Sequence, residues 1–393
     1  MMVEQAGARA PRRTHRMTAT RRDNIVGSPE RVDAPRLVGF DHLEWWVGNA
    51  RVFAGFLASH FGFSVEGYAG PETGVRHRAS YLLRQGDITF VVSGGLDPAS
   101  PIGHHQLLHG DGVRDIALRV DSAADAIGSA VARGANPAAP LTEESDGEGT
   151  LITASVSTYG DTIHTFVERH GPPGWFAPGF EPAELITPPG QRVGLAAIDH
   201  VVGNVERGAL DGWVTHYGTT FGFDELVHFD DQQISTEFTS LQSTVMWDGG
   251  GVVLPINEPA DGQRKSQIQE YIEHHQGPGV QHVAMRTDDI VAATDSLRDR
   301  GVRFLSVPPA YYDDARRRMQ GIDLPWDDLA RLGILVDRDK QGHLLQIFTE
   351  VLTDRPTIFC EIIQREGCRG FGVGNFRALF EAIEREQERR GNL

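Results

Sequence analysis

The side chains best suited to chemistry are two histidines and one glutamate, each inside an apolar run. Glu361 lies in the middle of Phe359-Cys-Glu-Ile-Ile363, whose aromatic and β-branched residues are typical of a buried strand. A carboxylate there is costly to bury unless it is paired, protonated or bound to a metal. His200 and His282 lie in two similar runs upstream. Two imidazoles and one carboxylate on one face form a triad that binds non-haem Fe(II) and leaves coordination positions open.

Each histidine taken alone has an ordinary alternative, because a histidine in a strand is more often a core or surface residue than a ligand. The pairs His104-His105 and His274-His275 lie in polar stretches and are expected to face solvent. The hypothesis of an iron site therefore depends on the fold bringing His200, His282 and Glu361 together.

The elements that must position these residues belong to an internal repeat. Residues 197–205 echo residues 40–49, and residues 277–287 echo residues 110–120. Such recurrence in order indicates two related halves. The first half keeps His42, but Asp115 stands in place of the second histidine and no counterpart of Glu361 is evident. We therefore expect that half to be structural and to hold no metal.

Each half divides again into two units of one strand, one helix and about three strands. This pattern predicts an α+β fold in which tandem β-α-β-β-β modules form two incomplete β-barrels. A helix over about residues 375–390 is expected to close the second barrel as a lid, following a glycine-rich loop. Its apolar residues would serve a plain docking helix equally well. Asn375 is a candidate N-cap of this helix.

Composition shifts suggest four segments. Residues 1–35 are polar and arginine-rich and are expected to be a disordered tail. An N-terminal barrel domain over 36–172 is followed by a Pro- and Gly-rich linker over 173–192. The C-terminal barrel domain, over 193–393, contains the candidate iron site.

The totals exclude several classes of protein. A formal net charge of −17 argues against nucleic acid and anionic membranes as partners. Cys360 and Cys368 are the only cysteines, which excludes a disulfide framework and favours the cytoplasm. No apolar run has the length of a membrane span. We expect a homo-oligomer, a dimer or tetramer, assembled through exposed strands of the first half.

Seven blocks of the second half resemble the 4-hydroxyphenylpyruvate dioxygenase family, within the vicinal-oxygen-chelate group of folds. The resemblance continues more weakly over the first half and covers roughly residues 37–393. The blocks are Ile198-Asp-His-Val-Val-Gly-Asn204, Leu254-Pro-Ile-Asn-Glu-Pro-Ala260, Lys265-Ser-Gln-Ile-Gln-Glu-Tyr271, Gly279-Val-Gln-His-Val-Ala284, Leu345-Gln-Ile-Phe-Thr349, Phe359-Cys-Glu-Ile-Ile-Gln-Arg365 and Gly370-Phe-Gly-Val-Gly-Asn-Phe376.

This resemblance implies an enzyme of tyrosine and phenylalanine catabolism with one Fe(II) per chain, held by His200, His282 and Glu361. Its substrates would be 4-hydroxyphenylpyruvate and O2, and both oxygen atoms would enter the products, homogentisate and CO2. The 2-oxo acid would chelate the iron through its carboxylate and keto oxygens and would supply the electrons itself.

The resemblance also implies roles for residues around the iron. The aromatic walls of the pocket would be Phe348, Phe359 and Phe376. The glutamine near the iron-bound end of the substrate would be Gln346. The polar groups that orient the ring hydroxyl would be Ser243, Asn257 and Gln267. Gln346, Phe348 and Phe376 are also expected to act in catalysis. Gln281 precedes His282, so strand alternation predicts that it faces away from the iron and supports the site from behind, as Asn375 does at the lid.

Two alternatives stay open. A 4-hydroxymandelate synthase would use the same substrate and iron but would hydroxylate the benzylic carbon. The loop end Gly374-Asn-Phe376 and the three phenylalanines favour homogentisate as the product. A catalytically inactive binding protein of the same fold would hold no metal, and the intact triad argues against it.

Overall fold

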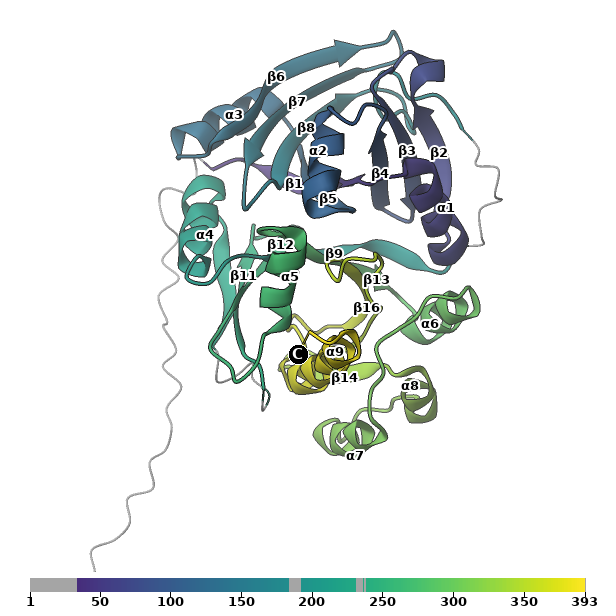
Figure 1. The fold of residues 1–393 in the computed structure, drawn as a ribbon, viewed down its shortest axis with the longest axis vertical. Helices are drawn as coiled ribbons and strands as arrows, with labels where there is room; N and C mark the ends of the chain where they lie inside the picture. The colour runs from purple at the N-terminus through teal and green to yellow at the C-terminus, as the bar shows by residue number, and fades with distance from the viewer. Residues whose placement is uncertain (1–33, 184–191, 231–235, 237, 393) are drawn as a thin grey trace, which may run out of the picture.

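The computed structural model describes residues 34–183, 192–230, 236 and 238–392. Most of the predicted tail, and residues 184–191 of the predicted linker, lie outside these ranges. Two eight-stranded curled sheets, one above the other, carry helices on their faces (Figure 1). The predicted α+β fold of paired incomplete barrels is thereby confirmed.

The first half follows the predicted modules, strand–helix–three strands, twice. Its strands are β1 (Leu37–Trp46), β2 (Ser64–Ala69), β3 (Arg78–Gln85), β4 (Ile88–Gly95), β5 (Gly112–Val120), β6 (Pro137–Ser145), β7 (Thr150–Ser157) and β8 (Ile163–His170). Its helices are α1 (Ala50–Phe61), α2 (Pro101–His109), α3 (Ala123–Ala132) and the 3-10 turn η2 (Pro71–Thr73).

The second half repeats this order, with two additional helices before its last three strands. The strands are β9 (Leu195–Asn204), β10 (Asp224–Phe229), β11 (Leu241–Trp247), β12 (Val253–Pro259), β13 (Gly279–Thr287), β14 (Leu335–Arg338), β15 (His343–Phe348) and β16 (Phe359–Glu366). The helices are α4 (Leu210–His216), the π-helical turn η3 (Tyr217–Phe221), α5 (Gln267–His275), α6 (Ile290–Asp299), α7 (Pro309–Arg318), α8 (Trp326–Leu332), the 3-10 turn η4 (Val373–Asn375) and α9 (Phe376–Arg390).

Both sheets have the same strand order, β2-β3-β4-β1-β5-β8-β7-β6 and β10-β11-β12-β9-β13-β16-β15-β14. The two modules of a half meet where their first strands pair antiparallel, β1 with β5 and β9 with β13. The repeated motif Phe-Gly-Phe ends the first helical segment of each half. Gly62 and Gly222 there have φ values of 74° and 71°, which only glycine adopts without strain.

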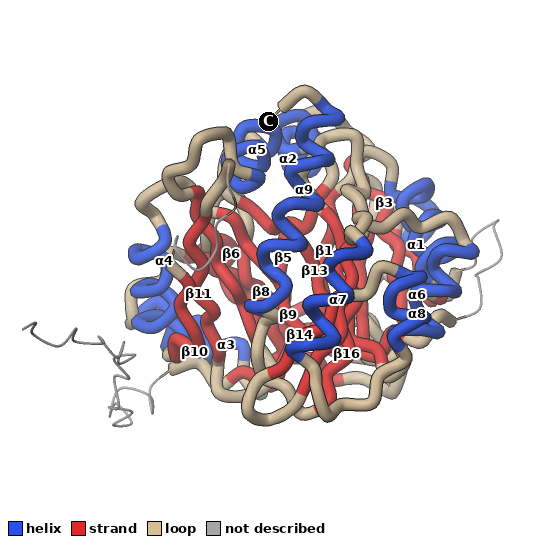
Figure 2. The backbone as a smooth tube through the Cα atoms, turned by 90° about the horizontal axis from the view of Figure 1, so that it is seen from below, coloured by secondary structure: helices blue, strands red, loops and turns tan. Residues whose placement is uncertain are grey.

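The C-terminal helix α9 lies within the curl of the second sheet, as Figures 1 and 2 show from two directions. Its apolar side packs toward the sheet through Leu379 and Phe380, which are nearly buried. Within the described residues, no helix is long and apolar enough to cross a membrane.

One of the contacts between the two halves lies between α2 and α5, where three histidine rings pack in a row. The ring centroids of His105 and His109 are 4.6 Å apart, and those of His109 and His275 are 4.3 Å apart. Burial lowers the pKa of His105 to about 3 and that of His275 to about 4, so both rings are neutral. The expectation that these two histidines face solvent is wrong, because α2 and α5 cover each other in the folded chain.

Candidate metal centre

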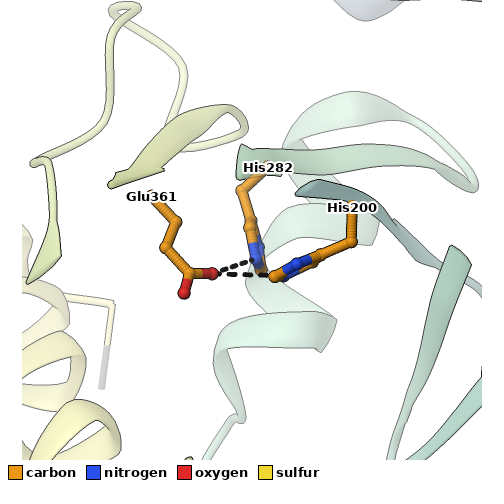
Figure 3. Close-up of side chains that lie close together, drawn as sticks. All are labelled: His200, His282 and Glu361. Atoms are coloured by element: carbon orange, nitrogen blue, oxygen red, sulfur yellow. Dashed lines mark ion pairs between the residues drawn. The ribbon is translucent and has the colours of Figure 1, made fainter. Parts of the chain in front are cut away.

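Three neighbouring strands at the middle of the second sheet carry the triad. β13 pairs antiparallel with β9, which places Ala284 opposite His200, and parallel with β16, which places Ala284 opposite Glu361. His282 lies two residues before Ala284 and therefore shares its face of the strand. Figure 3 shows the three side chains converging on one point.

The ligand atoms are close and buried. Nε2 of His200 lies 3.2 Å from Oε2 of Glu361, and Nε2 of His282 lies 3.4 Å from the same oxygen. One ligand atom from each residue lies within 4.8 Å of the others. Glu361 is 3% exposed, so water does little to separate the charges. Within the part of the chain that the structure describes, no second group of three such side chains converges.

Hydrogen bonds behind the rings fix which nitrogen faces the centre. Nδ1 of His200 is 2.7 Å from Oδ1 of Asp199, and Nδ1 of His282 is 2.9 Å from Oε1 of Gln281. Both acceptors require a proton on Nδ1, so the other ring nitrogen, Nε2, faces the Glu361 carboxylate and is the atom that a metal would bind. A buried carboxylate facing two such nitrogens needs a cation beside it, either a proton on one imidazole or a metal ion. The donor set therefore fits a metal ion.

The same geometry determines the protonation of the three side chains when no metal is bound. Burial opposes the charge of His200, but the Glu361 and Asp199 carboxylates raise its pKa to about 9. Burial would raise the pKa of Glu361, yet His200 and His282 lower it to about 2. Burial lowers the pKa of His282. At neutral pH the site thus holds one anionic carboxylate, one protonated imidazole and one neutral imidazole.

A pocket opens above the triad, between the sheet and α9. Its mostly apolar lining suits a small aromatic ligand. The wall of this pocket contains the three predicted metal ligands, every predicted substrate contact and also Gln281. Besides the triad, these residues are Ser243, Asn257, Gln267, Gln281, Gln346, Phe348, Phe359 and Phe376.

The predicted orientation of Gln281 is wrong. Gln281 lines the pocket instead of facing away from it, and it also bonds His282. Strand alternation fails here because the register between β13 and β9 shifts between Val280 and His282. Gln281 therefore both bonds a candidate metal ligand and borders the pocket.

Aromatic rings stand directly beside the candidate ligands. The ring of Phe359 stacks on that of His282, with centroids 4.8 Å apart and planes 19° apart. The ring of Phe348 meets His282 edge-on at 6.1 Å. From the opposite wall, Phe376 of α9 contacts Phe229 at 5.1 Å. These rings leave a slot lined by apolar faces.

The loop before α9 packs onto the pocket wall. Gly372 has a φ of 73°, and a Cβ atom there would lie 2.6 Å from Nε2 of Gln346. Asn375 occupies the predicted N-cap position, but its side chain forms no capping bond. Its Oδ1 accepts a hydrogen bond from the hydroxyl of Tyr311 on α7 (2.6 Å) instead. The additional helix α7 therefore anchors the start of α9.

Sequence reasoning missed Asp199, Arg365 and Phe371 as parts of the site. Arg365 binds Asp199 through two hydrogen bonds of 2.8 Å, and Phe371 lines the pocket against His200. A signal existed, since Asp precedes the histidine in both halves, and Arg169 and Arg365 are each the second-to-last residue of their strands, β8 and β16.

The corresponding place in the first half is filled by internal bonds. Thr165 stands at the register position of Glu361, and its hydroxyl and amide both donate to Asp115. Burial raises the pKa of Asp115 to about 6, although His42 and Thr165 oppose that shift. The oxygens of Asp115 that could have faced a cation are thus already hydrogen-bonded.

The paired curled sheets and the buried His-His-Glu set define a dioxygenase-type member of the glyoxalase fold. The model of the glyoxalase/bleomycin resistance protein/dioxygenase superfamily matches residues 197–347. The model of the N-terminal part of hydroxyphenylpyruvate dioxygenase matches residues 36–175.

Curated relatives identify the family to which the chain belongs within this class of protein. A 4-hydroxyphenylpyruvate dioxygenase from Tetrahymena thermophila is 43% identical over 93% of this chain and 94% of its own length. One from Caenorhabditis elegans is 44% identical over 92% of this chain and 95% of its own length. The chain belongs to the 4-hydroxyphenylpyruvate dioxygenase family, which confirms the resemblance and makes it an oxidoreductase.

A solved structure of a protein with a different named activity has the same fold. It is a variant of 4-hydroxymandelate synthase from Streptomyces coelicolor, 34% identical, with a TM-score of 0.79 over 89% of this chain and 99% of that one. The fold alone therefore does not separate the two reactions.

Proposed function

We propose that this chain converts 4-hydroxyphenylpyruvate and O2 into homogentisate and CO2 at one Fe(II) bound by His200, His282 and Glu361. The observation that carries the proposal is the convergence of these three ligands at the base of an apolar pocket, with both Nδ1 atoms already hydrogen-bonded. Bound Fe(II) would supply open coordination positions for the 2-oxo acid and for O2.

The residues that line the pocket fit the shape of this substrate. Phe348 and Phe359 flank the metal and would stack against the aromatic ring. Gln346, on the strand β15 beside Glu361, would donate to the carboxylate or keto group at the metal-bound end.

The polar groups that would hold the ring hydroxyl lie on neighbouring elements. Ser243 on β11 pairs in register with Asn257 on β12, and Gln267 begins α5. The amide nitrogen of Asn257 donates to Oδ1 of Asn204 (3.4 Å), so the amide oxygen of Asn257 would accept a hydrogen bond from the phenol hydroxyl. A ligand with a hydroxyl opposite its acid group would satisfy both ends of the pocket.

Helix α9 would exclude water from the site during the reaction. Phe376, Leu379, Phe380 and Ile383 present apolar side chains to the pocket. A dry site protects reactive oxygen intermediates from side reactions. The loop from Gly370 to Phe376 would act as the hinge.

The experiment is product analysis with 4-hydroxyphenylpyruvate, Fe(II) and O2. We expect homogentisate and CO2, with one O2 consumed per substrate. The 34% identity to a 4-hydroxymandelate synthase variant makes 4-hydroxymandelate the specific competing outcome. That product would replace the proposed reaction but retain the metal site. Turnover to neither product would support the binding-protein alternative.

We propose further that the protein is cytoplasmic and homo-oligomeric. Both cysteines are free and buried, which suits a reducing compartment. Every residue of the edge strand β6 is exposed, so the first half offers a strand edge to a second copy. Light scattering of the purified protein would give the subunit number, and a monomer would overturn the proposal.

A further inference from the structure

A half-buried arginine, Arg365, connects the loop from Gly370 to Phe376, here called the lid loop, to one of the three candidate ligands. Arg365 donates from Nε and Nη2 to the two oxygens of Asp199, each at 2.8 Å, and Asp199 accepts from Nδ1 of His200. The third nitrogen, Nη1, donates to the carbonyl oxygen of Gly370 at 2.6 Å. One planar side chain thus holds both the support of His200 and the first residue of the lid loop.

Phe371 completes the connection. Its ring lies between the Arg365 guanidinium, 5.3 Å from its centroid, and the His200 ring, whose centroid is 5.4 Å away at an angle of 74°. Phe371 also lines the pocket. A shift of the lid loop therefore disturbs the cation–π contact, the wall of the pocket and the packing of the ligand together.

The amide of Gly370 is held from the other side. It donates to Oδ2 of Asp339 at 2.9 Å, and the amide of Arg369 donates to the same oxygen at 2.8 Å. Gly370 is consequently fixed on both faces of its backbone. The peptide that follows, through Gly372 and Gly374, is where a change in backbone angles can occur.

The first half contains the same arrangement, although its described residues form no group of three converging metal-ligating side chains. Arg169 binds both oxygens of Asp41 at 2.6 and 3.0 Å, and Asp41 accepts from His42. Arg169 also donates to the carbonyl of Phe176 and lies over its ring at 4.8 Å, and that ring meets His42 edge-on. The fold therefore supplies an internal control, because Arg169 has the packing role but no triad to position.

We infer that Arg365 is a positioning residue that couples closure of the lid loop to the orientation of His200. When His200 is held by a metal, Asp199 and Arg365 are held with it, and Gly370 and Phe371 are drawn into place. Coupling of this kind is reciprocal, so a closed lid also strengthens metal binding. The inference rests on the proposed metal centre.

The test uses the full chain without metal, titrated with Co(II), and hydrogen exchange of the peptide spanning residues 366–376. In the wild type we expect Co(II) to bind and to slow exchange in that peptide. Failure of the wild type to bind Co(II) would refute the proposed metal centre itself.

Three variants then isolate the arginine. In Arg365→Gln we expect about 10- to 100-fold weaker Co(II) binding, the usual effect of losing a residue that supports a ligand, and no Co(II)-dependent protection. Arg365→Lys keeps a charge beside Asp199 but lacks the planar fork, so binding should weaken less while the protection is still lost. Arg169→Gln should lower the melting temperature and leave both Co(II) measurements unchanged.

Two results would overturn the coupling. One is wild-type Co(II) affinity with wild-type protection in Arg365→Gln. The other is an equal loss of Co(II) affinity in Arg169→Gln, which would show that both arginines act only through stability.

Discussion

The imidazole of His200 and the carboxylate of Glu361 face each other at 3.2 Å, although they belong to strands that do not pair with each other. Strand β13 lies between them and carries His282. Each of the three side chains is buried, so any one of them alone would be costly to charge. The predictions below follow from this mutual dependence.

Replacing Glu361 with Gln should abolish stoichiometric metal binding while the chain stays folded. The amide keeps the shape but provides no negative charge to hold a divalent cation. Metal content by elemental analysis and far-UV circular dichroism would be measured together. Asp115→Asn is the matched control, since it neutralises the buried acid at the equivalent place of His282 in the first half. Wild-type metal content in Glu361→Gln would exclude the triad.

Removing the metal should lower stability. A ligand that binds only the folded state stabilises it by about 2.7 kcal/mol at a concentration 100 times its Kd. We therefore expect chelation to lower the melting temperature of the wild type, and added Fe(II) or Co(II) to restore it. Glu361→Gln should give the same melting temperature with and without metal.

Metal affinity should increase with pH. The pKa of His200 is raised to about 9 in the metal-free protein, while that of His282 is lowered, so one proton must leave when a metal binds at neutral pH. The Kd for Co(II) should fall about tenfold per pH unit between roughly 6.5 and 9, and then level off. A Kd independent of pH in that window would contradict the assigned protonation.

The same shifts fix the sign of a stability effect in the metal-free protein. The contribution of protonated His200 is complete below pH 6.5 and is lost as pH rises through about 9. The contribution of Glu361 is present above pH 4.5 and is lost as pH falls through about 2. Urea denaturation of the metal-free wild type and of Glu361→Gln, each at pH 7 and pH 10, would measure the contribution of protonated His200 to the free energy of unfolding.

Gly372→Ala should loosen the lid loop. A methyl group there meets the amide of Gln346, and the positive φ adds strain. We expect more O2 consumed per molecule of product, because water then reaches the site. Gly321→Ala is the control, since Gly321 has a φ of 86° with nothing within 4 Å of an added Cβ. An equal ratio of O2 consumed to product formed in the two variants would show that the lid loop does not control this ratio.

Asn257→Leu should raise KM for 4-hydroxyphenylpyruvate by about 5- to 150-fold, corresponding to about 1–3 kcal/mol for an unsatisfied hydroxyl. Phenylpyruvate has no ring hydroxyl, so its KM should change little. Steady-state kinetics with both substrates would compare the two effects. An equal rise for both substrates would mean that Asn257 only shapes the pocket.

The sequence by itself determined the repeat, the fold class and the three candidate ligands. Periodicity shows which runs form strands, and burying Glu361 in such a run is costly without a partner. The matching of Gly62 with Gly222, and of His42 with His200, follows from the repeated backbone conformation. These features depend on short stretches of chain, which is why a single sequence reveals them.

Tertiary structure alone decided how distant residues support the site. The register shift in β13 turned Gln281 into the pocket, where strand alternation predicts the opposite. The bond from Tyr311 to Asn375 depends on an additional helix packing beside the lid. Arg365 reaches Asp199 and Gly370 together only because β9 and β16 flank β13 in the sheet and because the lid loop folds back toward the end of β16. Side-chain direction and long-range packing set these contacts, and neither can be read from local periodicity.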